Sequence, residues 1–228
     1  MMFREAESWV TDAETFRSYR VSQVRARREV PSLNTEACLF VHVLPLGRLS
    51  QRVDLAVREG TLRTVLRPMD SSGYSNRFNA DGFQLFYQGA GSVIQSYTQW
   101  FRSGGVEGYD GKISGSRNFG AKDDIKLLYA SEVCINVRSY VREAAKVVYD
   151  VLELDPPYIA LVSLVGVGGT RIVINDSLRF GDEIIPETLL LPPLIIENLG
   201  ADIDALLQPI LDVLWQSAGY SGELKRTT

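Results

Sequence analysis

The stretch that decides the fold is Tyr-Ile-Ala-Leu-Val-Ser-Leu-Val-Gly-Val-Gly-Gly-Thr-Arg-Ile-Val-Ile, residues 158–174. Its first eight residues are almost all aliphatic or β-branched, which is typical of a buried strand. Gly166, Gly168 and Gly169 can reach backbone angles that other residues avoid, so we expect a turn or bulge there and a partner strand at 171–174. A phosphate-binding loop is disfavoured, because the Lys-Ser/Thr ending and a following helix are both missing.

Length and composition favour one domain covering residues 1–228. The chain has 228 residues, 45% of them hydrophobic, and no low-complexity linker divides it, so we expect one sizeable core. A formal net charge of −4 argues against a protein that coats nucleic acid through its overall field. Cys38 and Cys134 lie in apolar stretches, which indicates reduced core residues in a reducing compartment. An acidic N-terminus and the lack of an apolar run of ~20 residues predict a cytoplasmic protein with no membrane contact.

Residues 1–28 predict an N-terminal helix. Apolar side chains recur there every three or four positions, at Phe3, Ala6, Val10, Ala13, Phe16 and Tyr19. The second half of the segment concentrates positive charge at Arg17, Arg20, Arg25, Arg27 and Arg28. Guanidinium groups bind phosphates and carboxylates well, so this basic region is a candidate docking site for nucleic acid or an acidic partner. The alternative is a solvated helix face, which is what most charge runs are.

The chain's only histidine, His42, lies in the apolar stretch 37–46, which predicts a second core strand ending near Pro45. A histidine in such a strand could act as a general base or a ligand. However, no second histidine is available to share a metal, and no nucleophile motif lies nearby. We therefore interpret His42 as a satisfied or partly buried core histidine, and keep it as a lower-ranked member of a ligand surface.

Residues 77–109 predict an antiparallel meander. A strand is expected at 77–87 with a turn or bulge at 79–82, and the strands at 93–101 and 106–109 are joined by a tight reversal at Gly104 and Gly105, as an antiparallel hairpin or meander. Polar side chains gather beside aromatic ones in this segment, and they make up the predicted ligand or partner surface: Arg77, Asn79, Asp81 and Arg102. Ordinary turn chemistry is the competing interpretation, because Asn-Ala-Asp-Gly is also what a turn favours.

The segment 122–152 predicts one long helix, since apolar residues alternate spacings of three and four along it. Its seam could pair two chains as a homodimer, but packing on a sheet is favoured. A strand interrupted by two prolines is expected at 188–197, a last helix from Asp202, and a frayed tail at 221–228. The predicted fold is a mixed α/β (α+β) single domain, with a largely antiparallel sheet flanked by three main helices.

No catalytic residue, metal ligand or cofactor can be assigned from these patterns. A metal-dependent nuclease or phosphohydrolase remains the enzymatic alternative, and it would need several carboxylates around a metal ion. The acids available for this are Asp110, Asp123, Asp124, Asp176, Asp182 and Glu183. Their spacing singles out no pair, so the enzyme hypothesis ranks second.

Several phrases together carry a family resemblance. They are Phe-Val-His-Val-Leu-Pro-Leu (40–46), Arg-Phe-Asn-Ala-Asp-Gly-Phe (77–83), Tyr-Thr-Gln-Trp-Phe-Arg-Ser-Gly-Gly-Val-Glu (97–107), Ser-Leu-Val-Gly-Val-Gly-Gly (163–169) and Leu-Leu-Gln-Pro-Ile-Leu-Asp-Val-Leu-Trp-Gln-Ser-Ala-Gly (206–219). In their order and spacing, they resemble the C-terminal region of bacterial Schlafen-AlbA-type proteins, which are labelled as ATP-binding or DNA-binding. The likeness covers nearly all of the chain.

In that family an N-terminal Schlafen-AlbA domain precedes this region and carries the nucleotide or nucleic-acid chemistry. The resemblance therefore implies an AlbA-type effector domain as a partner, in cis or in trans, and it implies no enzyme. The expected function is a non-catalytic sensing or interaction domain that regulates or docks to such an effector. A nucleic-acid-binding module that uses the basic region Arg17 to Arg28 is a further alternative.

Overall fold

The computed structural model describes residues 2–26, 33, 36–46, 52–117, 125–174 and 179–223. The first half of the stretch 158–174 forms β8 (Tyr158–Val165), and every residue of β8 is buried. Strand β1 (Cys38–Pro45) pairs with β8 along its whole length, while β11 (Thr188–Leu190) and β12 (Leu194–Ile196) share the opposite side of β8. The predicted core strands and the proline-interrupted strand are confirmed.

Beyond β1, the larger sheet continues as an antiparallel meander. Its remaining strands are β5 (Val106–Asp110), β4 (Ile94–Phe101), β3 (Gly82–Gln88) and β2 (Ser75–Phe78), and the full order is β11-β8-β1-β5-β4-β3-β2. A short 3₁₀ turn, Ala90–Ser92, joins β3 to β4. The predicted meander is therefore confirmed.

A second, smaller sheet was not predicted. It contains β6 (Ser114–Arg117), β7 (Ile125–Leu128), β9 (Arg171–Ile174) and β10 (Arg179–Glu183), in the order β10-β9-β7-β6. The prediction that β9 is the partner of β8 was wrong. Both sides of β8 are already paired, so the chain turns away at Gly166 and β9 pairs in parallel with β7.

Gly166 is needed at this turn. Its φ is 75°, and an added Cβ would lie 1.9 Å from the carbonyl oxygen of Glu36. Only glycine combines that backbone angle with such a close approach. The glycine turn predicted after β8 is therefore confirmed, although it leads to another sheet.

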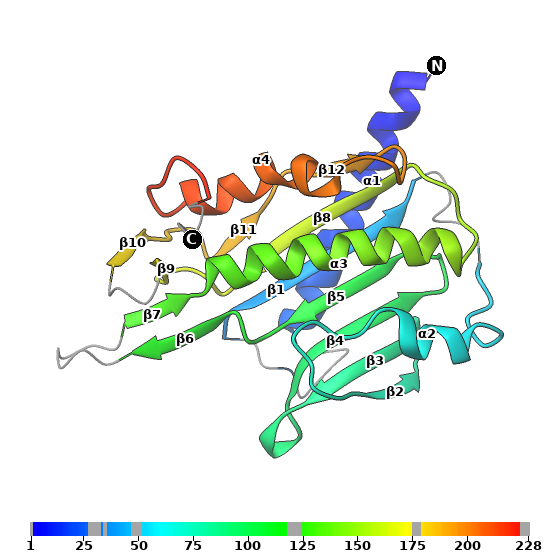
Figure 1. The fold of residues 1–228 in the computed structure, drawn as a ribbon, viewed down its shortest axis with the longest axis horizontal. Helices are drawn as coiled ribbons and strands as arrows, with labels where there is room; N and C mark the ends of the chain where they lie inside the picture. Colours follow the sequence, from blue (N-terminus) through cyan, green and yellow to red (C-terminus); the bar gives the residue numbers. More distant parts are fainter. Residues whose placement is uncertain are drawn as a thin grey trace.

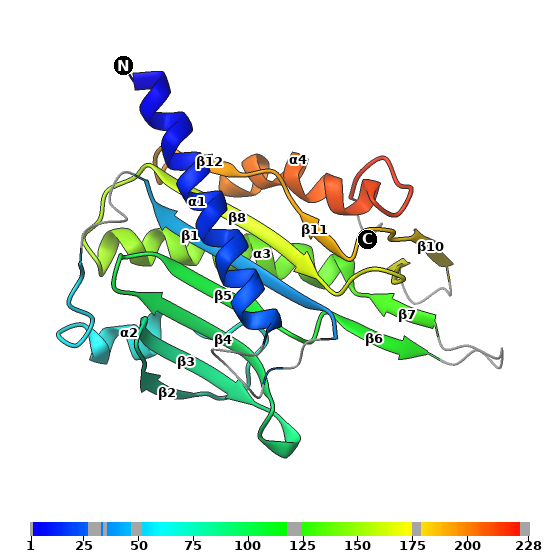
Figure 2. The same cartoon turned by 180° about the vertical axis from the view of Figure 1, so that it is seen from behind.

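Helices cover both faces of the larger sheet (Figures 1 and 2). On one face lie α3 (Ala130–Asp150), α4 (Ile203–Gln216) and the short α2 (Glu59–Val65), while α1 (Met2–Arg25) crosses the other face. Asp202 caps α4 as expected, because its carboxylate accepts from the backbone N–H of Ala205 at 3.1 Å. The predicted single α/β domain with three main helices is confirmed.

The long helix begins later than predicted. Leu127 and Leu128 continue the three-four spacing, but they belong to β7, and α3 begins only at Ala130. Residues 122–124 lie outside the described part of the chain. The seam itself packs on the sheet, since its members are all buried: Ala130, Cys134, Val137, Val141, Ala144 and Val148. The predicted packing of this seam on the sheet is therefore observed, and the homodimer stays an untested alternative.

Two predictions for the chain ends need correction. Tyr19 was assigned to the apolar face of the first helix, yet it is 54% exposed, whereas Arg17 and Arg20 are buried. The helix is rotated so that these arginines face the sheet, for reasons given below. At the other end, residues 221–223 are held in place, because Glu223 accepts a hydrogen bond from Arg138 at 3.1 Å and donates its backbone N–H to Asp212 at 2.8 Å. Residues 224–228 lie outside the described residues.

No helix within the described ranges combines the length and apolar character needed to cross a bilayer. The cytoplasmic location stays a prediction.

Candidate functional site

A row of polar side chains crosses five strands of the larger sheet on the face covered by α1. The residues are directly paired, strand by strand, in the order His42, Glu107, Gln99, Gln84 and Arg77. Paired residues of antiparallel strands point to the same face, so the five side chains form one line, which we call the polar row. It runs from the buried centre of the sheet to the edge strand β2.

Glu107, the second residue of the polar row, accepts hydrogen bonds from three side chains. Arg20 of α1 donates to both carboxylate oxygens, Nη2 to Oε1 at 2.9 Å and Nε to Oε2 at 3.0 Å. The Tyr97 hydroxyl donates to Oε1 at 2.7 Å, and His42 Nε2 lies 2.8 Å from Oε2. Glu107, His42 and Tyr97 are fully buried, and Arg20 is 3% exposed. Two-point pairing of this kind is the strongest ion-pair geometry.

Glu107 is ionised in this setting. Burial alone raises its pKa, but the attraction of Arg20 and the hydrogen bonds from His42 and Arg20 outweigh burial and hold the pKa well below its usual range. An ionised carboxylate only accepts, so His42 Nε2 carries the proton in their contact. Burial, followed by the charge of Glu107, raises the pKa of Tyr97 well above 10.0, so its hydroxyl is a donor at neutral pH. The cluster is a fixed ion pair with two further donors, His42 and Tyr97, around it.

The cluster also fixes α1 on the sheet. Besides Glu107, Arg20 contacts Asp81, with 3.1 Å between Nη1 and Oδ2, and its guanidinium lies 4.9 Å from the centre of the Phe101 ring. One turn earlier, Arg17 donates from Nη1 to the carbonyl oxygen of Leu191 at 3.1 Å. Small apolar clusters lie on either side of these contacts, one around Val21 and Val24 and the other around Ala13. Two buried arginines therefore anchor the helix.

This arrangement corrects the predicted basic region. Arg17 and Arg20 are 4% and 3% exposed, so neither can contribute to a surface for nucleic acid, and neither belongs to a solvated face. They are buried because β5 supplies the Glu107 carboxylate and the segment between β11 and β12 supplies the Leu191 carbonyl oxygen as partners. The side chain of Arg25 and all of Arg27 and Arg28 lie outside the described part of the structure.

Three members of the predicted ligand surface lie together at one end of the β2–β3 hairpin. Arg77 Nε donates to Gln84 Oε1 at 2.9 Å, and Asn79 Nδ2 donates to Gln99 Oε1 at 2.7 Å. Asp81 reaches Arg20, as described above, and is half-exposed. We call the exposed part of this hairpin end, together with Arg102, the hairpin surface.

The other two predicted members, Arg102 and His42, lie in different places. Arg102 is exposed in the β4–β5 turn, beside the hairpin, and its backbone N–H donates to the Asp81 carbonyl oxygen at 3.1 Å. His42 is fully buried beneath α1, so it cannot be part of a partner surface. It is a core histidine, but only one ring nitrogen is satisfied: Nε2 contacts Glu107, while the buried Nδ1 has no hydrogen-bond partner among the described residues.

Sequence reasoning missed Glu107, Tyr97, Gln84 and Gln99, which hold the polar row together. One signal was available. Gln84, Gln99 and Glu107 are polar residues within predicted strands, and each lies directly opposite another polar residue once the strands pair. Recognising the row needed the register of the strands, which the separate segments do not reveal.

The three carboxylates of the enzyme hypothesis that the structure describes, Asp110, Asp182 and Glu183, do not converge on one site. Asp110 ends β5 in the larger sheet, while Asp182 and Glu183 lie in β10 of the smaller one. Across the residues that the structure describes, no group of three acidic, histidine or cysteine side chains could hold a metal ion. Asp123, Asp124 and Asp176 lie outside those residues.

Comparison with known proteins gave no match to a family model, a curated protein or a solved structure. The resemblance to Schlafen-AlbA-type proteins stays a prediction.

Proposed function

We propose that this chain is a non-catalytic sensing or interaction domain that docks to or regulates an AlbA-type effector domain, in cis or in trans. The observation that supports this most directly is the state of the side chains best suited to acid–base chemistry. His42, Glu107 and Tyr97 are fully buried beneath α1, and they direct their hydrogen bonds to each other and to Arg20. A general base needs its substrate within hydrogen-bond reach. These three side chains instead hold α1 on the sheet, which is a structural role.

The hairpin surface is the proposed docking site. Arg77 and Arg102 are exposed there, and Asp81 lies between them and α1. Guanidinium groups recognise carboxylates through paired hydrogen bonds, so the expected partner surface is acidic. The buried glutamines Gln84 and Gln99 hold the hairpin from below. The exposed charges are therefore presented from a rigid base, which lowers the entropic cost of binding.

The proposal is tested by titrating an AlbA-type effector domain into the purified chain and its variants, with calorimetry as the readout. Arg77→Ala and Arg102→Ala are expected to weaken binding, each by about two- to fivefold for an exposed ion pair, while the melting temperature stays nearly unchanged. Arg171→Ala is the matched control, since Arg171 is also exposed but lies in β9 of the other sheet.

Three results would count against the proposal. One is an affinity that the hairpin variants leave unchanged. Another is a large loss of thermal stability in those variants, which would assign Arg77 and Arg102 to structure. The third is hydrolysis of nucleic acid or nucleoside triphosphate that a chelator abolishes, because this would favour the metal-dependent enzyme.

A further inference from the structure

β2 is the last strand of the larger sheet, and its outer edge is open. Among the described residues no strand pairs with that edge, since the strand order ends at β2. Figure 1 shows β2 at the lower border of the sheet, away from α3 and α4. An open edge presents backbone N–H and C=O groups to which another extended chain can bond. β2 is therefore a candidate site for strand addition.

The alternation of hydrogen bonds along β2 shows which of its backbone groups point outward. The backbone N–H of Asn79 donates to the Gly82 carbonyl oxygen at 2.9 Å, so these two residues form a hydrogen-bonded pair. Bonded and non-bonded pairs alternate along an antiparallel ladder. Every second residue back from Asn79, Arg77 included, therefore bonds to β3. Asn76 and Phe78 direct their N–H and C=O groups away from β3.

The pairing on the other side of β3 gives the same alternation. The backbone N–H of Arg102 donates to the Asp81 carbonyl oxygen at 3.1 Å, so the odd-numbered residues of β3 bond to β4 and the even-numbered ones bond to β2. Within the described part of the chain, the outward backbone groups of Asn76 and Phe78 make no hydrogen bond. They are available to a partner chain.

Two other strand edges are protected. Pro192 and Pro193 interrupt the edge formed by β11 and β12. The C-terminal segment covers β10, because the Asp182 backbone N–H donates to the Ala218 carbonyl oxygen at 3.0 Å. Prolines, charged side chains and covering segments are the usual protection against unwanted strand pairing.

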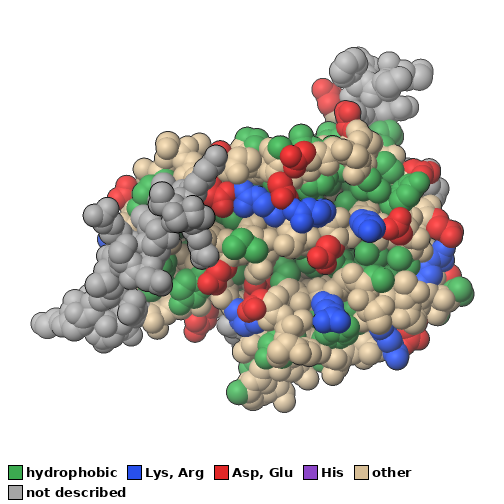
Figure 3. Space-filling view, viewed as in Figure 1, with side chains coloured by type: hydrophobic (Ala, Val, Ile, Leu, Met, Phe, Trp, Pro, Cys, Tyr) green, Lys and Arg blue, Asp and Glu red, His purple; other side chains and the backbone are tan. Residues whose placement is uncertain are grey.

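The strands next to the β2 edge lack this protection. Residues 71–101 contain no proline, and their only charged residues are Arg77 and Asp81. Asp81 is already bonded to Arg20. Figure 3 shows charged side chains of both signs over α3 and α4, and few along the lower margin of the molecule, where β3 and its turn into β4 lie. The charge that remains at the edge is therefore positive.

Side chains on the two faces of β2 differ in chemistry. On the α1 face, the guanidinium of Arg77 donates to Gln84 and lies 4.9 Å from the centre of the Phe86 ring. On the α3 face, Phe78 is 42% exposed, and its ring centre is 4.9 Å from that of Phe83. A chain added beside β2 alternates its side chains between the same two faces. It would meet a cation on one face and an aromatic ring on the other.

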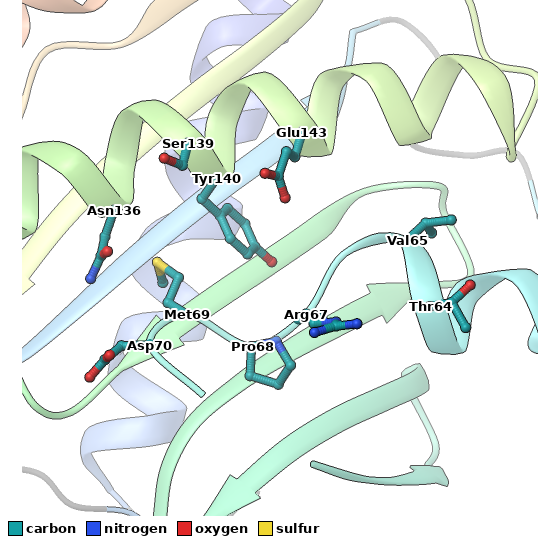
Figure 4. A pocket seen from close by; sticks show the side chains of 10 residues that line it. All are labelled: Thr64, Val65, Arg67, Pro68, Met69, Asp70, Asn136, Ser139, Tyr140 and Glu143. Carbon is teal, nitrogen blue, oxygen red and sulfur yellow. The ribbon is translucent and has the colours of Figure 1, made fainter. Parts of the chain in front are cut away.

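The segment that leads into β2 is held in place. The Tyr74 hydroxyl donates to the Arg63 carbonyl oxygen at 2.6 Å. The Thr98 hydroxyl donates to the Arg67 carbonyl oxygen at 3.3 Å and lies 3.2 Å from the Tyr140 hydroxyl. In Figure 4, Tyr140 projects from α3 toward the segment that carries Arg67. An edge held in this way needs little ordering when a partner binds.

We propose that the outer edge of β2 binds an extended acidic segment of the docking partner as an added antiparallel strand. The identity of that partner rests on the proposed docking function. An acidic residue opposite Arg77 would occupy a pair without backbone hydrogen bonds, where the side chains of antiparallel strands are closest. Apolar residues on either side of it would lie on the face where Phe78 is exposed.

A second copy of this chain fits the edge less well. The register that uses the outward groups of both Asn76 and Phe78 in each copy places the two Arg77 side chains opposite each other. Like charges at directly opposite positions are destabilising. The occupant is therefore a different, acidic chain.

Titration of the isotope-labelled full chain with the peptide acetyl-Thr-Val-Glu-Val-Thr-amide, followed by NMR, tests the proposal. Saturable shifts and slower hydrogen exchange are expected for the amides of Asn76 and Phe78, because strand addition bonds them. The same peptide with lysine in place of glutamate should bind about fivefold more weakly, since an attraction becomes a repulsion. Arg77→Glu should reverse that preference.

Asn76→Pro removes one outward N–H without breaking a bond to β3, and proline is tolerated at such edge positions. It should weaken binding of the glutamate peptide about five- to tenfold, as for one lost hydrogen bond. Asn76→Ala is the matched control, because it keeps the N–H and should bind as the unmodified chain does. If Asn76→Pro fails to fold, the reversed preference of Arg77→Glu still decides the matter.

Strand addition is overturned if the glutamate peptide gives no saturable binding, or if Asn76→Ala weakens binding as much as Asn76→Pro. It is equally overturned if the chain alone forms a dimer in sedimentation that Asn76→Pro dissociates, because a second copy would then occupy the edge.

The docking function can fail separately. If Arg77→Ala weakens binding of the AlbA-type effector domain and Asn76→Pro does not, docking stands and strand addition is wrong. If the peptide binds as expected and the effector domain does not bind, strand addition stands and its partner is another acidic protein.

Discussion

Replacing Glu107 with glutamine should destabilise the domain by about 3 kcal/mol, at the lower end of the range for breaking a buried ion pair. The two carboxylate oxygens accept from Arg20, His42 and Tyr97. A glutamine keeps one acceptor oxygen and turns an N–H group toward the donors at the other position. At least one buried donor then loses its acceptor, at about 1–3 kcal/mol, and Arg20 loses its buried counter-charge. Asp81 still contacts Arg20, which keeps the loss from rising further.

Urea denaturation at neutral pH measures this loss, and a thermal melt should show a decrease of roughly 6–12 °C for a domain of this size. Glu153→Gln is the matched control. Glu153 forms an ion pair with Arg58, but its side chain is 78% exposed, so we expect a change within about 0.5 kcal/mol. If Glu107→Gln is no more destabilising than this control, the account of the buried cluster is wrong.

The destabilisation caused by Glu107→Gln should also decrease as the pH is lowered. The pKa of Glu107 is lowered from its ordinary value of 4.5, so the folded state holds the ionised form more tightly than the unfolded chain does. The stabilisation is therefore complete above about pH 4.5 and is lost as the pH falls toward the folded-state pKa. The difference in unfolding free energy between the unmodified chain and Glu107→Gln should shrink on acidification. A difference that is constant down to pH 3 would contradict the ion pair.

Two further predictions concern the α3 face. Gly108→Ala should cost about 1–3 kcal/mol, measured by urea denaturation, because the new methyl group would lie 2.5 Å from the Tyr140 ring; a neutral result would mean that the ring moves freely. Burial raises the pKa of the Cys134 thiol to about 12, so a thiol reagent should label it only at the rate of unfolding. Rapid labelling in the native state would refute this.

Local patterns were enough to predict the elements that pack in a simple way. The unbroken apolar run of β1 reports a strand buried on both faces, whereas the alternation along the meander and the three-four spacing of α3 report burial of one face. Gly104 and Gly105 marked the β4–β5 reversal because tight turns have backbone requirements of their own. For these segments, the local preference and the tertiary environment agree.

Prediction failed where the environment overrides the local pattern. Leu127 and Leu128 fit the helical spacing, but β6 and β9 pair with their strand, so α3 begins after them. Arg17 and Arg20 lie in a charge run that is typical of a solvated face. They are nevertheless buried, because acceptors from distant parts of the chain surround them. Arg20 and Glu107 are 87 residues apart in the chain. No local window contains both members of the pair, so only the fold reveals it.

The two faces of the larger sheet are held by different forces, and this bears on function. On the α3 face, a continuous apolar core fixes the helices through buried area. On the α1 face, the described residues form two small apolar clusters, which fix the position of the helix less tightly than one large core would. The Arg20–Glu107 pair fixes that position. A shift of α1 by one residue rotates its side chains by about 100° and takes Arg20 away from the carboxylate, leaving two buried charges unpaired.

We infer that the cluster specifies the register of α1 more than it adds to stability, as buried polar groups do in some other systems. Because Arg20 also holds Asp81, the same pair fixes the hairpin surface relative to the helix.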